Sequence, residues 1–148
     1  MIERLKEISF YVVVGFLLTG ISKALDSAFL EEYLKVNLIT LLIALLAINT
    51  TTSSVVMTKL KEIADAAGGN FKCTIEQLKL SIYEQVMLIV LAAILMILAG
   101  SKIVIGLHVW MPFILNGAIA SVFVAGLYAL FDTAKSIFVI LRYEDQDR

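Results

Sequence analysis

Four long stretches without a charged residue constrain this chain more than any other feature of its sequence. They cover residues 8–22, 36–58, 85–101 and 103–131. A helix needs about 20 apolar residues to cross the hydrocarbon core of a bilayer, with a range of about 17 to 25. The second and fourth stretches reach this length outright, the third is marginal, and the first reaches it if Lys23 snorkels. We therefore predict an all-α polytopic membrane protein with four transmembrane helices, and a chain with three is the alternative.

The composition argues against an ordinary soluble domain. Of the 148 residues, 60% are hydrophobic and 17% are charged, and the mean hydropathy is +0.93. One domain of this size, covering residues 1–148, cannot bury so much apolar surface, so the excess is expected to face the lipid bilayer. The net charge of −1 provides no basic field that would attract nucleic acid, and we expect no nucleic-acid partner.

Residues that could carry catalysis or bind a metal are few. Cys73 and His108 are the single cysteine and the single histidine, which is too few for a structural zinc site or an intramolecular disulfide. The sequence has no Gly-rich phosphate loop and no HExxH, GxSxG or CxxC motif. We therefore expect a protein that is not an enzyme and that needs no metal or cofactor.

The positions of Lys and Arg predict the orientation of the spans. Nine of the 12 basic residues lie in the N-terminal segment, in residues 59–84 and in the C-terminal tail, and the other three lie in the two remaining loops. Because basic segments resist translocation, both termini are predicted on the cytoplasmic side of the inner membrane. Residues 23–35 and the stretch around Trp110 then lie outside, and Pro112 fits the first turn of the last helix.

Helical patterns continue past the spans on the cytoplasmic side. Residues 55–84 keep apolar residues at helical spacing on both sides of Gly68-Gly69-Asn70, which predicts a helical hairpin with a turn. A similar pattern follows Asp132. We expect helices two, three and four to extend into the cytoplasm, where residues 55–84 and 132–148 offer surfaces for a cytosolic protein partner.

One face of the second helix carries small and polar residues at intervals of three and four. This helix-two row consists of Asn37, Thr40, Ala44, Ala47, Thr51, Ser54 and Thr58. Such a row is not expected to face lipid. It fits either a packing seam, because small hydroxyl side chains let helices approach closely, or one wall of a water-filled path. Asn49, Thr50, Thr52 and Ser53 make the cytoplasmic end of the helix polar on every side, which a seam does not require.

The fourth helix has a second row, with a small residue at every fourth position. It consists of Gly117, Ser121, Ala125 and Ala129. This spacing predicts close contact with another helix, in the same chain or in a neighbouring copy. Gly15 on the first helix, near Thr19 and Gly20, is a weaker matching surface.

Three charged residues are predicted at the cytoplasmic edge of the membrane. Asp132 and Lys135 are one helical turn apart, and Glu84 begins the third span at a similar depth. They fit either ordinary charges in the headgroup zone or a site for a proton or cation.

The plan of the chain resembles small membrane subunits of phage-exclusion and anti-phage defence systems. It is similar to the Rex-type exclusion membrane protein in length and in the polar end of helix two (Asn49 to Ser54), followed by Lys59, Lys61 and the carboxylate of Glu84. It is similar to the membrane subunit of the Kiwa system in topology. The resemblance implies an oligomeric inner-membrane protein that responds to infection, by ion leakage in the first case or by recruiting a cytosolic partner in the second. It transfers no site residues.

Two functional hypotheses follow. In the first, a homo-oligomer conducts or gates ions along the helix-two row and depolarises the membrane, and the cytoplasmic hairpin transmits a signal to it. Four short spans leave little room for a pore inside one chain, so several copies would surround the path. In the second, a non-conducting scaffold recruits a cytosolic effector through its cytoplasmic helices, and both rows serve only packing.

Overall fold

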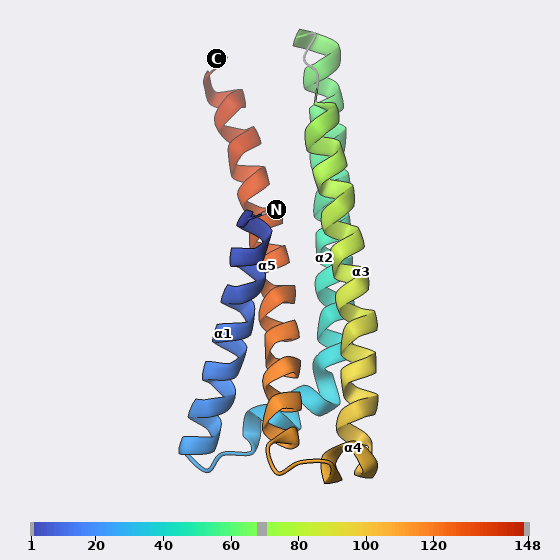
Figure 1. Cartoon of the computed structure of the whole chain (residues 1–148). Helices are drawn as coiled ribbons and strands as arrows, with labels where there is room; N and C mark the ends of the chain where they lie inside the picture. The colour runs from blue at the N-terminus through green and yellow to red at the C-terminus, as the bar shows by residue number, and fades with distance from the viewer. Residues whose placement is uncertain (1, 68–70, 147–148) are drawn as a thin grey trace.

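The computed structural model describes residues 2–67 and 71–146, and side chains within 6–62, 64–65, 71 and 74–135. These residues form α1 (Ile2–Ala24), α2 (Phe29–Ala67), α3 (Lys72–Gly100), the short α4 (Lys102–Gly106) and α5 (Met111–Gln146) (Figure 1). The described part of the chain contains no strand, so the all-α prediction is confirmed. The predicted turn at Gly68-Gly69-Asn70 lies outside the described residues.

Four of these helices are long and apolar enough to cross a membrane. The qualifying segments are Lys6–Ala24, Phe29–Glu62, Thr74–Gly100 and Met111–Lys135. The first segment contains Lys23, as the prediction of a full-length first span required. Among the described residues, four helices and not three are therefore long and apolar enough to span a membrane.

The second helix begins at Phe29, earlier than the charge-free stretch that starts at residue 36. Leu34 and Leu38 are buried against the other helices, while Glu31 and Lys35 form an ion pair one turn apart toward solvent. The charges therefore lie on the outer side of an amphipathic helical segment and do not form a loop. The last long helix begins at Met111, with Pro112 in its first turn as predicted.

The long helices form two pairs that meet at α5. α1 packs along α5, α2 packs antiparallel to α3, and α5 also contacts both α2 and α3 (Figure 1). The first turns of α2 run across the lower end of α5 before the helix turns upward (Figure 1). At the upper end, α2, α3 and α5 all extend past the start of α1.

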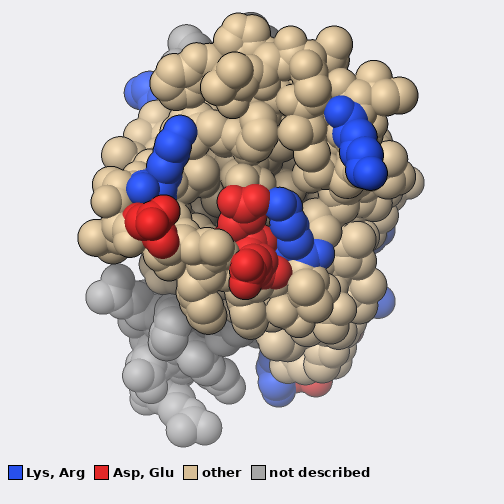
Figure 2. All heavy atoms as spheres, turned by 90° about the horizontal axis from the view of Figure 1, so that it is seen from below, with Lys and Arg blue, Asp and Glu red and all other residues tan. Residues whose placement is uncertain are grey.

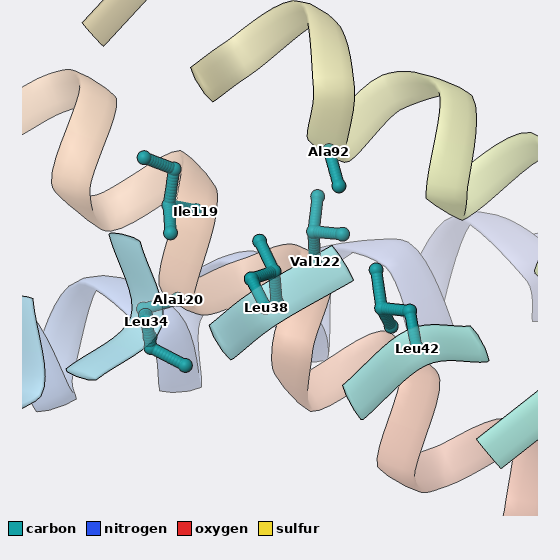
Figure 3. Close-up of a cluster of buried hydrophobic side chains, with 7 residues drawn as sticks. All are labelled: Leu34, Leu38, Leu42, Ala92, Ile119, Ala120 and Val122. Carbon is teal, nitrogen blue, oxygen red and sulfur yellow. The ribbon is translucent and has the colours of Figure 1, made fainter. Parts of the chain in front are cut away.

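Two hydrophobic cores stabilise this arrangement. In the larger core, Leu34, Leu38 and Leu42 of α2 lie beside three residues of α5, with one of α3 (Figure 3). The remaining members are Ile119, Ala120, Val122 and Ala92. Among the described side chains, the smaller core consists of Val56, Leu60 and Leu78 and joins α2 to α3 near their turn. The α2–α3 hairpin therefore has a core of its own.

Candidate functional site

The helix-two row lies on the face of α2 that the chain's other helices leave uncovered. Asn37 is half-buried, and the six other members are exposed. The buried residues Leu42, Asn49 and Val56 each precede a member of the row by two positions, and two positions correspond to about 200° of rotation around a helix. The row and the buried face of α2 thus lie on opposite sides of the helix. Within one chain the row is not a packing seam.

Three of the four hydroxyl groups of the row donate to the backbone of their own helix. Thr51 Oγ1 donates to the Ala47 carbonyl at 2.9 Å, Ser54 Oγ to Thr50 at 2.8 Å, and Thr58 Oγ1 to Ser54 at 3.0 Å. A hydroxyl has one donor and two acceptor lone pairs. With these three donors occupied, the uncovered face of α2 presents oxygen acceptors near its Thr51 to Thr58 part.

A group of buried polar residues occupies the opposite face of α2. Asn49 and Ser53 are fully buried, and so, at 3% exposure, is Gln85 of α3. Asn49 Nδ2 donates to Ser81 Oγ at a long 3.4 Å. The antiparallel register of the two helices brings Val56 near Leu78. The same register places Asn49 opposite Gln85, and Ser53 opposite Ser81. We call these four residues the polar seam.

Most polar atoms of the polar seam lack a hydrogen-bond partner among the described residues. These atoms are Asn49 Oδ1, Ser53 Oγ, and both the oxygen and the nitrogen of the Gln85 amide. Leaving a buried polar atom unsatisfied costs about 1–3 kcal/mol. The apolar cores on either side of the seam contain no such defect, so the α2–α3 pair is locally weakened at this depth.

The sequence showed that helix two is polar on every side near Asn49 but did not show which residues face inward. The missed signal was the spacing of four between Asn49 and Ser53 on α2, matched by the same spacing between Ser81 and Gln85 on α3. Two matched polar pairs on antiparallel helices predict a shared interface.

The row on the fourth helix lies against α1. Gly117 and Ser121 are buried, and Ala125 and Ala129 are half-buried. A Cβ on Gly15 would lie 2.4 Å from the Ser121 backbone nitrogen, and one on Gly117 would lie 2.7 Å from the Phe16 ring. Ser121 Oγ donates to the Gly117 carbonyl at 2.7 Å. The two helices therefore touch through their backbones here.

The predicted edge charges lie near one another on different helices. Glu84 of α3 and Asp132 of α5 are exposed, and both, with Glu7 of α1, are close enough to Tyr11 to act on it electrostatically. The Lys135 ammonium lies 4.8 Å from the centroid of the Phe131 ring. Three helices thus bring carboxylates to one end of the bundle. Among the described residues, no three His, Cys, Asp or Glu side chains are grouped so that they could hold a metal ion.

Neither a protein-family model, nor a curated protein sequence, nor a solved structure matches this chain.

Proposed function

We propose that this chain is the subunit of a homo-oligomeric inner-membrane protein that conducts small cations along the helix-two row. The exposure of the row on a single chain carries this proposal. The other helices of the same chain cover the opposite face of α2. A polar path can therefore form only where the rows of several copies meet around an axis.

The chemistry of the row favours a cation. The hydroxyl donors of Thr51, Ser54 and Thr58 are occupied by backbone carbonyls, so these oxygens would face the path as acceptors. Neutral oxygen ligands can replace part of the hydration shell of a monovalent cation. The carboxylates of Glu84 and Asp132 add negative charge at one end of the bundle.

In the proposed orientation, the upper end of Figure 1 is cytoplasmic. The extensions of α2, α3 and α5 lie at this end, and the segments that meet there carry nine of the 12 basic residues. The α2–α3 hairpin and the end of α5 would then project into the cytoplasm. Reporter fusions at residue 69 and at the C-terminus test this orientation. A reporter that works only in the cytoplasm should be active at both positions, and a reporter that works only outside the membrane should be inactive at both.

Flux through proteoliposomes tests conduction. The Thr51→Leu, Ser54→Leu variant places two apolar side chains in the path, and we expect a potential-sensitive dye to show at least a tenfold loss of K⁺ flux. Thr50→Leu is the matched control, because Thr50 is an exposed threonine whose hydroxyl also donates to its own helix, but it lies outside the row. Equal flux in both variants would overturn the proposal.

A second candidate function rests on the separate core of the α2–α3 hairpin. Among the described side chains, Val56, Leu60 and Leu78 hold the ends of the two helices together without a contribution from α1 or α5. A self-supporting hairpin is suited to recruiting a cytosolic effector. Pull-downs from cytosol should then recover one partner with the full chain, and Lys59→Glu together with Lys61→Glu should release it without changing ion flux.

We also propose that phage infection triggers conduction. This part of the proposal rests on the resemblance in plan to exclusion and defence subunits. Cells that express the chain should lose membrane potential within minutes of infection. Cells that express the Thr51→Leu, Ser54→Leu variant should keep it.

A further inference from the structure

A cavity of about 320 Å³ lies at the end of the bundle farthest from the α2–α3 turn. It forms where the end of α1, the start of α2 and the start of α5 meet. Figure 2 shows this end, where acidic and basic side chains surround a hollow. In the proposed orientation the cavity opens on the outer side of the membrane.

The walls of the cavity combine an apolar base with polar groups. Leu34, Phe113 and Ile119 supply apolar surface, and Ser22 and Asn116 are among the polar groups. Binding pockets for small molecules typically measure about 300–1,000 Å³ and combine apolar walls with a few polar groups. The cavity is at the small end of this range, so it fits a small molecule or a headgroup and not a whole lipid.

Charges of both signs line the cavity, and they come from different elements. Lys23 comes from α1, Asp26 from the following turn, and Glu31 from α2. The Glu31 carboxylate already accepts a hydrogen bond from Lys35, and Asn116 lies close to it. A carboxylate has about four acceptor positions, so Glu31 retains capacity for a further donor.

The ammonium group of Lys23 is held only weakly. It lies 5.3 Å from the centroid of the Trp110 ring and 5.5 Å from that of Phe113. No described carboxylate forms a salt bridge with it. Exposed cation–π contacts are worth about 0.5–1 kcal/mol, so an anionic group in the cavity can draw this ammonium away from the rings.

We propose that the cavity binds a small zwitterion in which a primary ammonium and a phosphate or carboxylate are a few bonds apart. The ammonium would bind Glu31 and Asp26, and the anionic group would bind Lys23. Lys23 and Lys35 balance Asp26 and Glu31, so the site matches a ligand with no net charge. Ethanolamine linked through a phosphodiester has this chemistry, as the free solute glycerophosphoethanolamine or as a phospholipid headgroup. The site lies within one chain and does not depend on conduction.

Radiolabelled glycerophosphoethanolamine tests the proposal on the full-length protein in dodecyl maltoside. We expect saturable binding that weakens about tenfold in Glu31→Gln, which corresponds to about 1.4 kcal/mol. Glu32→Gln is the matched control, because Glu32 is the adjacent exposed carboxylate outside the cavity and this variant should bind like the parent. Trp110 is the only tryptophan, so the fluorescence emission of the protein reports on the ring that Lys23 contacts. This emission should change on binding with the same affinity as the radiolabel assay gives. It should stay constant in Lys23→Gln.

The lipid environment separates the two sources of the ligand. If the headgroup is the natural occupant, nanodiscs of phosphatidylethanolamine will suppress binding of the free probe relative to nanodiscs of phosphatidylglycerol. If a free solute is the occupant, both nanodiscs will bind the probe equally. The absence of saturable binding in detergent and in phosphatidylglycerol nanodiscs, or equal affinities of Glu31→Gln and Glu32→Gln, would overturn the proposal.

Discussion

The α1–α5 pair and the α2–α3 pair bury polar groups in opposite ways. Where α1 meets α5, the buried Ser121 hydroxyl donates to the Gly117 carbonyl of its own helix, and Gly15 lets the two backbones touch. Between α2 and α3, polar atoms of Asn49, Ser53 and Gln85 are buried without a partner. The first pair is therefore closely packed with its buried hydroxyl satisfied, and the second contains the buried polar atoms that lack a partner among the described residues.

This difference bears on gating. The polar seam and the helix-two row lie on opposite faces of α2, so a rotation of α2 that brings water to Asn49 and Ser53 also turns Thr51 and Ser54. The α1–α5 pair would stay in place during such a movement. We infer that the hairpin moves against a stationary α1–α5 pair.

The largest effect is expected from Gly15→Ala in the tight pair. The new Cβ would lie 2.4 Å from the Ser121 backbone nitrogen and 2.6 Å from its Cα, so the helices must separate. We expect the free energy of unfolding to fall by about 3 kcal/mol. Unfolding from dodecyl maltoside into SDS, followed by circular dichroism, measures the change.

Gly20→Ala is the control for this substitution. No atom lies within 4 Å of the position that its Cβ would occupy, and it is on the same helix. Alanine is a better helix former than glycine by about 1 kcal/mol, so stability should be unchanged or slightly higher. Equal losses in the two variants would show that the α1–α5 contact is not tight.

A smaller effect of opposite sign is expected from Asn49→Leu combined with Gln85→Leu in the polar seam. Replacing buried, unsatisfied polar groups with apolar ones should raise the free energy of unfolding by about 1–2 kcal/mol. Val56→Asn, in the neighbouring apolar core, should lower it by a similar or larger amount. A double variant that is less stable than the parent would show that the buried polar atoms of Asn49 and Gln85 do have hydrogen-bond partners.

The smallest effect is expected from Ser121→Ala. Its hydroxyl donates at 2.7 Å within its own helix and reaches the Val12 carbonyl of α1 only at 3.5 Å. Hydrogen bonds inside membrane proteins contribute about 0.6 kcal/mol on average. The loss in the same SDS assay should therefore stay below about 1 kcal/mol. A loss as large as that of Gly15→Ala would mean that the hydroxyl, and not the closeness of the backbones, holds α1 to α5.

Much of the fold could be predicted from the sequence because lipid imposes long charge-free helices. The start of α2 was missed because Glu31, Glu32 and Lys35 suggested a loop. The spacing of four between Leu30, Leu34 and Leu38 was the signal that the helix continues through these charges. Charged residues end a charge-free window, but they do not end an amphipathic helix.

Less of the candidate site could be predicted. The spacing of the helix-two row was visible, but its direction depends on which face of α2 meets α3 and α5. The polar seam depends on the register of two helices, and the cavity depends on three helix ends that meet around Lys23 and Glu31. One sequence does not fix these tertiary relations.

The central claim is that the helix-two row faces the same row in other copies of the chain. Disulfide cross-linking in membranes tests it, with Thr51→Cys in a Cys73→Ser background. Ile97→Cys on α3 is the control, since Ile97 is a highly exposed apolar residue expected to face lipid. We predict cross-linked dimers for Thr51→Cys and monomers for Ile97→Cys on non-reducing gels. Monomers for Thr51→Cys, or equal cross-linking of both, would contradict the claim.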